Sequence, residues 1–109
     1  MGRGGLAGSL AERPGPGYRR PVVVVQSDDL NRSLIGTVIC VPLTSNMKWA
    51  QAPGNVALSS RDTGLPKDSV ANVSLIVAMH KRQLTHHVGK LSRRRLELVL
   101  AGIEIVLGR

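Results

Sequence analysis

Short β-branched runs carry most of the hydrophobic residues of this chain. Residues 21–26 (PVVVVQ) are apolar and bounded by polar residues, which is typical of a buried strand. A second strand is expected over residues 35–43 (IGTVICVPL) and a short one over residues 55–58 (NVAL). Residues 69–79 (SVANVSLIVAM) fit one or two strands with a partly polar face. These runs predict a mainly β domain.

Polar segments lie between these runs and predict the connections. Residues 27–33 (SDDLNRS) are expected to link the first two strands. Residues 44–54 are expected to form a loop, and residues 59–67 a longer loop that contains the turn formers Gly64 and Pro66.

The end of the chain has helical periodicity instead. Ser92 is a suitable N-cap for a helix that runs through Leu107, and Gly108 lies where a C-terminal glycine cap is common. Apolar residues recur at helical spacing: Leu96, Val99, Leu100, Ile103 and Leu107. Leu98 and Ile105 fall off this stripe, so the helix is apolar on more than one side. We therefore expect it to pack against a partner as well as its own sheet.

The start of the chain shows no strand-like alternation. Residues 1–17 are rich in Gly, Pro, Ala and Arg, and we expect them to be flexible or weakly structured. The predicted organisation is this N-terminal segment followed by one folded domain over residues 18–109. Several strands with a C-terminal helix predict an α+β fold, a compact barrel or half-barrel that the helix closes.

The charge of the chain indicates a polyanionic partner. Fifteen Lys and Arg stand against 7 Asp and Glu, which gives a net charge of +8. A solvated basic surface is the alternative. Both interpretations also apply to Arg93–Arg95, which lie in the first turn of the expected helix, where positive charge is unfavourable. Tyr18 and Trp49 are the only aromatic residues, which disfavours a protein that stacks every base on an aromatic platform.

Other side-chain chemistry is sparse. Cys40 is the only cysteine, so an internal disulfide and a cysteine-based zinc site are excluded, and its apolar context predicts a small buried hydrophobe. His80, His86 and His87 lack the carboxylate spacing of a catalytic triad and are expected at the surface or an interface. We expect no metal and no cofactor. Because no signal peptide or membrane span is evident, the expected compartment is the cytoplasm.

Four segments together resemble the toxins of the PemK/MazF family. Residues 17–33 (GYRRPVVVVQSDDLNRS) resemble its basic residues, proline, hydrophobic strand and Asn/Asp-rich loop. Residues 37–58 (TVICVPLTSNMKWAQAPGNVAL) resemble its strand ending in Thr-Ser, with the loop and return strand that follow. Residues 64–76 (GLPKDSVANVSLI) resemble its Gly-Leu and Asp-Ser-Val region, and residues 84–108 its Gly-x-Leu and C-terminal helix.

This resemblance implies a fold and a function. The fold is a small SH3-like β-barrel with helices, of the PemK/MazF/CcdB type, that forms a homodimer. Members are sequence-specific endoribonucleases that cut single-stranded RNA, including mRNA, without a metal. A cognate antitoxin occupies the RNA groove, and the toxin binds DNA in company with it.

The resemblance also assigns site residues. Arg20 falls on the catalytic arginine and Thr44 on the catalytic threonine. A guanidinium is planar, permanently charged and suited to phosphate oxygens, so Arg20 fits charge stabilisation better than general base catalysis, and the base stays open. The RNA-binding candidates are Arg19, Ser45, Lys48 and Trp49. For each of these residues an ordinary structural role is the alternative, and for Trp49 we favour a place at the edge of the core.

The first residues depart from the family pattern. Residues 3–17 (RGGLAGSLAERPGPG) lack the usual aromatic residues, so the first strand is expected to be weak or missing. Glu12 is the candidate for the family's acidic loop residue, and Leu75 stands where a polar residue is usual. Two alternatives therefore stay open: a non-catalytic or degenerate relative that still binds antitoxin, and an inhibitor of DNA gyrase. The tail IEIVLGR disfavours the second because it has no aromatic residue.

Overall fold

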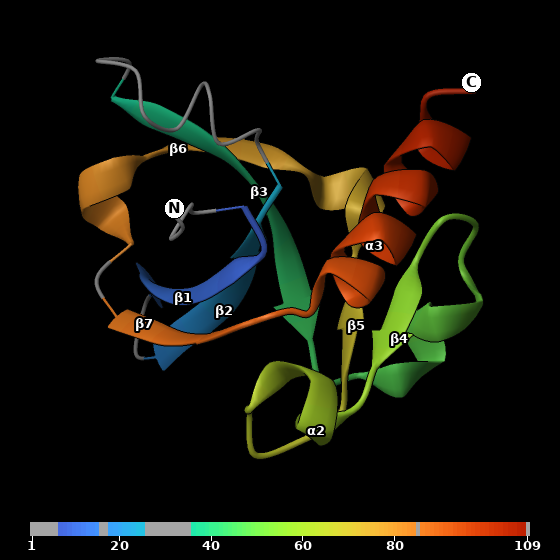
Figure 1. Ribbon diagram of the computed structural model, residues 1–109, viewed down its shortest axis with the longest axis horizontal. Coiled ribbons are helices and arrows are strands. Elements are labelled where there is room, and N and C mark those ends of the chain that lie inside the picture. The colour runs from blue at the N-terminus through green and yellow to red at the C-terminus, as the bar shows by residue number, and fades with distance from the viewer. Residues whose placement is uncertain (1–6, 16–17, 26–35, 85, 109) are drawn as a thin grey trace.

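Seven antiparallel strands form a curled sheet that a C-terminal helix covers (Figure 1). The structure, a computed structural model, describes residues 7–15, 18–25, 36–84 and 86–108. The strands are β1 (Ser9–Gly15), β2 (Tyr18–Val24), β3 (Thr37–Thr44), β4 (Val56–Leu58), β5 (Ser69–Ala71), β6 (Val77–His80) and β7 (His86–Lys90). The helices are α2 (Ser60–Thr63) and α3 (Arg93–Val106), with 3₁₀ turns η1 (Met47–Gln51), η2 (Val73–Leu75) and η3 (Lys81–Gln83).

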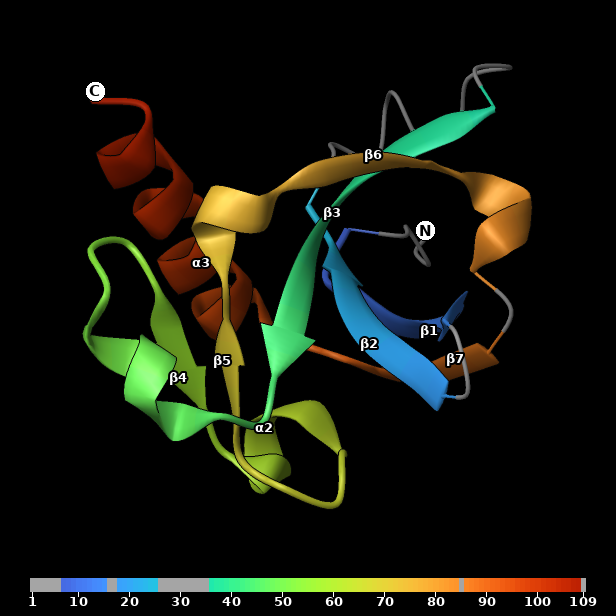
Figure 2. The ribbon, with the colours of Figure 1, turned by 180° about the vertical axis from the view of Figure 1, so that it is seen from behind.

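The strand order makes a half-barrel. The strands follow the order β4-β5-β3-β2-β1-β7, and β6 also pairs with β3. The long strand β3 joins two halves, with β1, β2 and β7 on one side and β4, β5 and α3 on the other (Figures 1 and 2). The predicted mainly β fold with a C-terminal helix is therefore confirmed. The predicted connection over residues 27–33 lies outside the described residues.

The core lies on both faces of β2, as its unbroken apolar run predicts. Val23 and Val25 belong to the larger cluster, which also contains Leu10, Val41 and Val99. Val22 and Val24 belong to a smaller cluster, with Val38, Cys40 and Met79 as its other buried members. Cys40 is completely buried, which confirms its predicted role as a small hydrophobe.

Helix α3 begins and ends close to the predicted positions. The Ser92 hydroxyl accepts a hydrogen bond from the Arg95 N–H at 3.2 Å, as an N-cap does. Val99 is buried, and Leu96, Leu100 and Ile103 pack against the larger core cluster. Leu107, the last residue of the predicted apolar stripe, is 65 % exposed, because it follows the last turn of the helix.

The prediction of a weak or missing first strand is wrong for residues 9–15. Strand β1 pairs with β2 from Leu10↔Val23 to Gly15↔Tyr18 and with β7 on its other side. Leu10 is fully buried and anchors the strand in the core. Strand pairing on two sides therefore overrides the low strand propensity of Gly and Ala.

Three local elements differ from the sequence prediction. The expected loop over residues 44–54 contains η1, and the loop over residues 59–67 contains α2. Residues 69–79 form two strands separated by η2, and β7 was not predicted. Among the described residues, no helix is long and apolar enough to cross a membrane.

Candidate active site

A cavity of about 490 Å³ opens where β2 begins and β3 ends. Residues of β1, β2 and β3 line one side of it, and residues of the segment that follows α2 line the other. Figure 2 shows how these elements are arranged from behind. Its polar lining residues are Glu12, Arg20, Thr44, Ser45, Lys67 and Ser69, and its apolar ones are Pro21, Leu43, Leu65 and Pro66. Four of the predicted site residues therefore line one cavity: Glu12, Arg20, Thr44 and Ser45.

Arg20 and Thr44 come together at neighbouring ends of two paired strands. Strands β2 and β3 pair from Val24 with Cys40 to Val22 with Pro42, and Arg20 and Thr44 both lie just beyond the last of these pairs, where both line the cavity. The Thr44 hydroxyl oxygen accepts the Asn46 N–H at 3.2 Å, which leaves its own proton available to donate. Pro21 fixes the backbone directly after Arg20.

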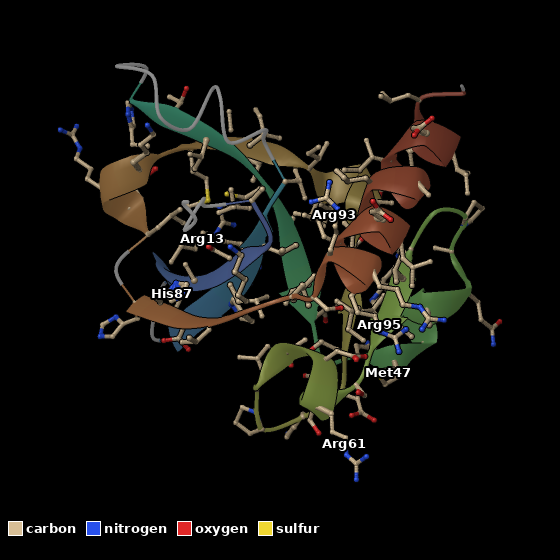
Figure 3. All side chains as sticks on the ribbon, in the orientation of Figure 1. Arg13, Met47, Arg61, His87, Arg93 and Arg95 are labelled. Carbon is tan, nitrogen blue, oxygen red and sulfur yellow. The ribbon has the colours of Figure 1, made fainter. Side chains whose placement is uncertain are left out.

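Strand β1 adds two charged residues to this end of the sheet. Glu12 lies opposite Pro21 and lines the cavity, and Arg13 lies opposite Arg20. Arg13 is half-buried inside the curl of the sheet, where its guanidinium lies 4.0 Å from the sulfur of Met79 (Figure 3). The strand that was expected to be weak therefore places a carboxylate in the cavity and sets Arg13 opposite Arg20 in the strand pair.

The other RNA-binding candidates lie outside the cavity lining. Trp49 in η1 is 45 % exposed, so the preferred prediction that it borders the core is wrong. The Lys48 ammonium lies 5.6 Å from the centre of the Trp49 ring, a cation–π distance. Lys48 and Trp49 follow the cavity-lining residue Ser45 by three and four positions in the sequence. The side chain of Arg19 lies outside the described residues.

Sequence reasoning missed one wall of the cavity. Leu65, Pro66, Lys67 and Ser69 line it, but this segment was noted only for its family resemblance and turn formers. The available signal was Lys67, a cation next to Pro66 in a turn-rich segment. The tertiary contacts that place this segment against the strand ends cannot be predicted from the spacing of residues along the sequence.

The histidines do not assemble a site. His80, His86 and His87 are all exposed, as predicted, and none of them is among the described residues that line the cavity. His86 lies opposite Glu12 in the β1–β7 pair. Within the described ranges, no group of three or more His, Cys, Asp or Glu residues could hold a metal ion.

The arginines at the start of α3 have partners within the fold. The Arg95 Nε lies 3.1 Å from Asp62 Oδ1 in α2, and the Arg93 Nε lies 3.6 Å from Glu97 Oε2 one turn on. The Ser59 N–H bonded to Asp62, together with the Arg95 charge, lowers the pKa of the Asp62 carboxyl despite some burial. Arg95 therefore connects α3 to the short helix that precedes the cavity wall.

Comparisons with known proteins agree with this geometry. Residues 10–107 match the family model of the PemK-like, MazF-like toxins of type II toxin-antitoxin systems. The chain is 46 % identical over 92 residues to the endoribonuclease MazF6 of Mycobacterium tuberculosis, covering 84 % of this chain and 81 % of that one. It is 30 % identical over 88 residues to the endoribonuclease EndoA of Bacillus subtilis, covering 81 % and 75 %.

Solved structures show the same fold. The Mycobacterium tuberculosis toxin MazF-mt6 superposes with a TM-score of 0.78 at 15 % identity, covering 92 % of this chain and 96 % of that one. MazE-MazF from Deinococcus radiodurans gives 0.76 at 23 % identity, covering 94 % and 93 %. The family match spans nearly the whole chain, with the cavity residues inside it. This chain belongs to the PemK/MazF family of type II toxin–antitoxin proteins.

Proposed function

We propose that this protein is the endoribonuclease toxin of a toxin–antitoxin pair and cuts single-stranded RNA at specific sequences without a metal. The observation that carries the proposal is the shared cavity of Arg20, Thr44 and Glu12. The relatives that support it are themselves named endoribonucleases. Cellular mRNA is the proposed substrate, and the cytoplasm the proposed place of action.

The proposed reaction uses the RNA's own 2′-hydroxyl as the nucleophile. The 2′-oxygen bonds to the adjacent phosphorus while the bond from phosphorus to the 5′-oxygen breaks. The leaving 5′-oxygen takes a proton from water, so the products are a 2′,3′-cyclic phosphate and a free 5′-hydroxyl. Arg20 stabilises the charge that develops on the phosphoryl oxygens, and the Thr44 hydroxyl donates to one of them. Glu12 is our candidate for the base that takes the 2′-hydroxyl proton, since it supplies the carboxylate among the described lining residues.

Cleavage assays with EDTA present test this function. Arg20→Ala should lower kcat by about 100-fold or more, the scale of losing one preorganised charge-stabilising group. Arg20→Lys should recover only part of the rate, because an ammonium lacks the planar fork. Thermal melts of each variant report whether it folds. If the folded wild-type protein cuts no RNA across a library of varied sequences, the proposed activity is wrong.

The formation of β1 supports an active toxin over a degenerate one. The doubt about activity came from residues 3–17, yet β1 is paired on both sides and Glu12 lines the cavity. We further propose that Arg19, Ser45, Lys48 and Trp49 bind RNA beside the reacting phosphate. Trp49 has the exposure needed to stack on a base.

We also propose two protein partners. A mycobacterial relative and the Deinococcus radiodurans protein were solved with antitoxins, and we expect an acidic antitoxin segment to compete with RNA for the basic cavity. The second partner is another copy of this chain. Large apolar residues are exposed on α3 and around η2, which packs against α3: Leu75, Ile76, Leu98, Ile105, Val106 and Leu107.

Light scattering of the purified protein tests the homodimer. We expect the mass of a dimer for the wild type and of a monomer for Leu75→Asp, because an interfacial carboxylate would be buried without a partner. An unchanged dimer for Leu75→Asp and also for Ile105→Asp would show that this apolar surface is not the interface.

A further inference from the structure

Lys67 occupies a distinctive position in the cavity. It belongs to the segment between α2 and β5, whereas Arg20 and Thr44 belong to the strands on the other side. Its side chain is exposed. A substrate in the cavity would therefore meet a cation on each side.

The backbone around Lys67 is held by several side chains. Asp68 Oδ1 accepts the Ser60 N–H at 2.8 Å, directly after Lys67. The Ser69 hydroxyl donates to the Lys67 carbonyl at 3.4 Å, and Thr63 Oγ1 accepts the Leu65 N–H at 3.0 Å. Thr63 is itself buried. Because these bonds fix both flanks, a ligand that binds Lys67 has little backbone to order.

The positive charge of Lys67 is not neutralised by any residue in the part of the chain that the structure describes. Its ammonium makes no ion pair or hydrogen bond with those residues. The neighbouring carboxylate of Asp68 accepts a backbone N–H of α2. Arg95 differs, because it is paired with Asp62. Lys67 is thus a cation on a fixed segment, turned to a cavity and available to an anion.

We propose that Lys67 is a second phosphate-binding group of this site and contacts a phosphate that flanks the scissile one. The inference rests on the proposed function, since it takes the substrate to be RNA. A cavity of about 490 Å³ is much larger than one phosphate and has the size of sites that hold a whole small ligand. Arg20 and Thr44 hold the reacting phosphate from the strand side, and Lys67 holds its neighbour from the opposite wall.

Lys67→Met is the first test, with Arg61→Met as its matched control. Both changes remove one positive charge near α2, but Arg61 extends from α2 away from the body and does not line the cavity (Figure 3). Lys67→Met should lower kcat/KM about 10- to 100-fold, the scale of one charge-assisted hydrogen bond. It should also reduce the slope of log K against log salt for single-stranded RNA by about 0.7. Arg61→Met should change both much less, and Lys67→Arg should retain most of the activity.

A scan with neutral phosphates identifies the contact. Each phosphate of a short RNA substrate is replaced in turn by a methylphosphonate, and cleavage is measured with the wild type and Lys67→Met. At one flanking position the replacement should weaken the wild type but have little further effect on Lys67→Met. Additive losses at every position, or equal effects of Lys67→Met and Arg61→Met, would overturn the proposal.

A binding assay separates this inference from the cleavage activity. An RNA with a 2′-deoxy residue at the cleavage position cannot react, so its affinity reports binding alone. If the wild type binds RNA but does not cut it, the proposed function fails while the Lys67 contact is still measured. If the wild type cuts RNA and Lys67→Met binds it as tightly as the wild type does, the Lys67 proposal fails alone.

Discussion

Gly102→Ala tests how closely α3 packs against the rest of the fold. Gly102 is a buried residue in the middle of α3. A Cβ added there would overlap the carbonyl oxygen of Gly54 and lie 3.1 Å from its carbonyl carbon. Helix propensity alone predicts the opposite outcome, a gain of about 1 kcal/mol for alanine over glycine. The sign of the measured change therefore decides which effect dominates.

The Gly54 turn has little freedom to move away. Gly54 has φ +82°, and the Asn55 side chain next to it donates to the Trp49 carbonyl at 2.9 Å and accepts the Val73 N–H at 3.0 Å. Carbon–oxygen contacts are normally about 3.3 Å or longer, so α3 would have to shift by an amount on the order of 1 Å. That shift loosens the contact of Val99 and Ile103 with the core.

We expect Gly102→Ala to destabilise the fold by about 2 kcal/mol net, an overpacking cost of about 3 kcal/mol less the propensity gain. The melting temperature should fall by about 10 °C for a domain of this size. Thermal melting by circular dichroism, with urea titration for the free energy, measures both. Ala101→Gly at the exposed neighbouring position is the control and should cost about 1 kcal/mol by propensity. A melting temperature of Gly102→Ala at or above that of the wild type would refute the reasoning.

Three further outcomes are expected. Asp62→Asn should lower the free energy of unfolding by about 1 kcal/mol at pH 7, as loss of a capping interaction does. Because the folded-state pKa of Asp62 is below 3.8, this difference should disappear in urea titrations as the pH falls through that lower pKa. Burial raises the pKa of the Cys40 thiol from 9.0 to about 11, so alkylation with iodoacetamide should be at least about 100-fold slower in the folded protein than in urea. Trp49→Ala should weaken RNA binding by about 1–3 kcal/mol without lowering the melting temperature, and an unchanged affinity in a fluorescence titration would exclude stacking.

The predictable elements are those whose local pattern and tertiary role agree. The valines of residues 21–26 are apolar at every position, and the strand they form is buried on both faces. Ser92 and the apolar stripe after it define α3 locally. Strand β1 could not be predicted in this way, because its stability comes from pairing with β2 and β7. Leu10 is the one large aliphatic side chain in β1 and gives a weak signal by itself.

The candidate site also contains residues that the sequence could predict and residues that it could not. Arg20 and Thr44 lie where a predicted strand begins and another ends, so resemblance could assign them, and both line the cavity. The segment from Leu65 to Ser69 reaches the same cavity only through the tertiary structure. Its position depends on bonds between residues far apart in sequence, such as that of Arg95 to Asp62. Trp49 was misjudged because an isolated large apolar residue in a loop has no neighbours in sequence that indicate burial.

Arg95 connects the basic first turn of α3 to the wall of the candidate active site. A positive charge in the first turn of α3 opposes the helix dipole, at a cost of about 0.3–1 kcal/mol. Arg95 offsets that cost by its ion pair with Asp62, which in turn caps α2 through the Ser59 N–H at 2.9 Å. Helix α2 leads directly into the cavity wall that carries Lys67. The arginine is therefore better explained as support for the wall than as a contact for RNA, and its replacement should disturb phosphate binding indirectly, through the position of Lys67.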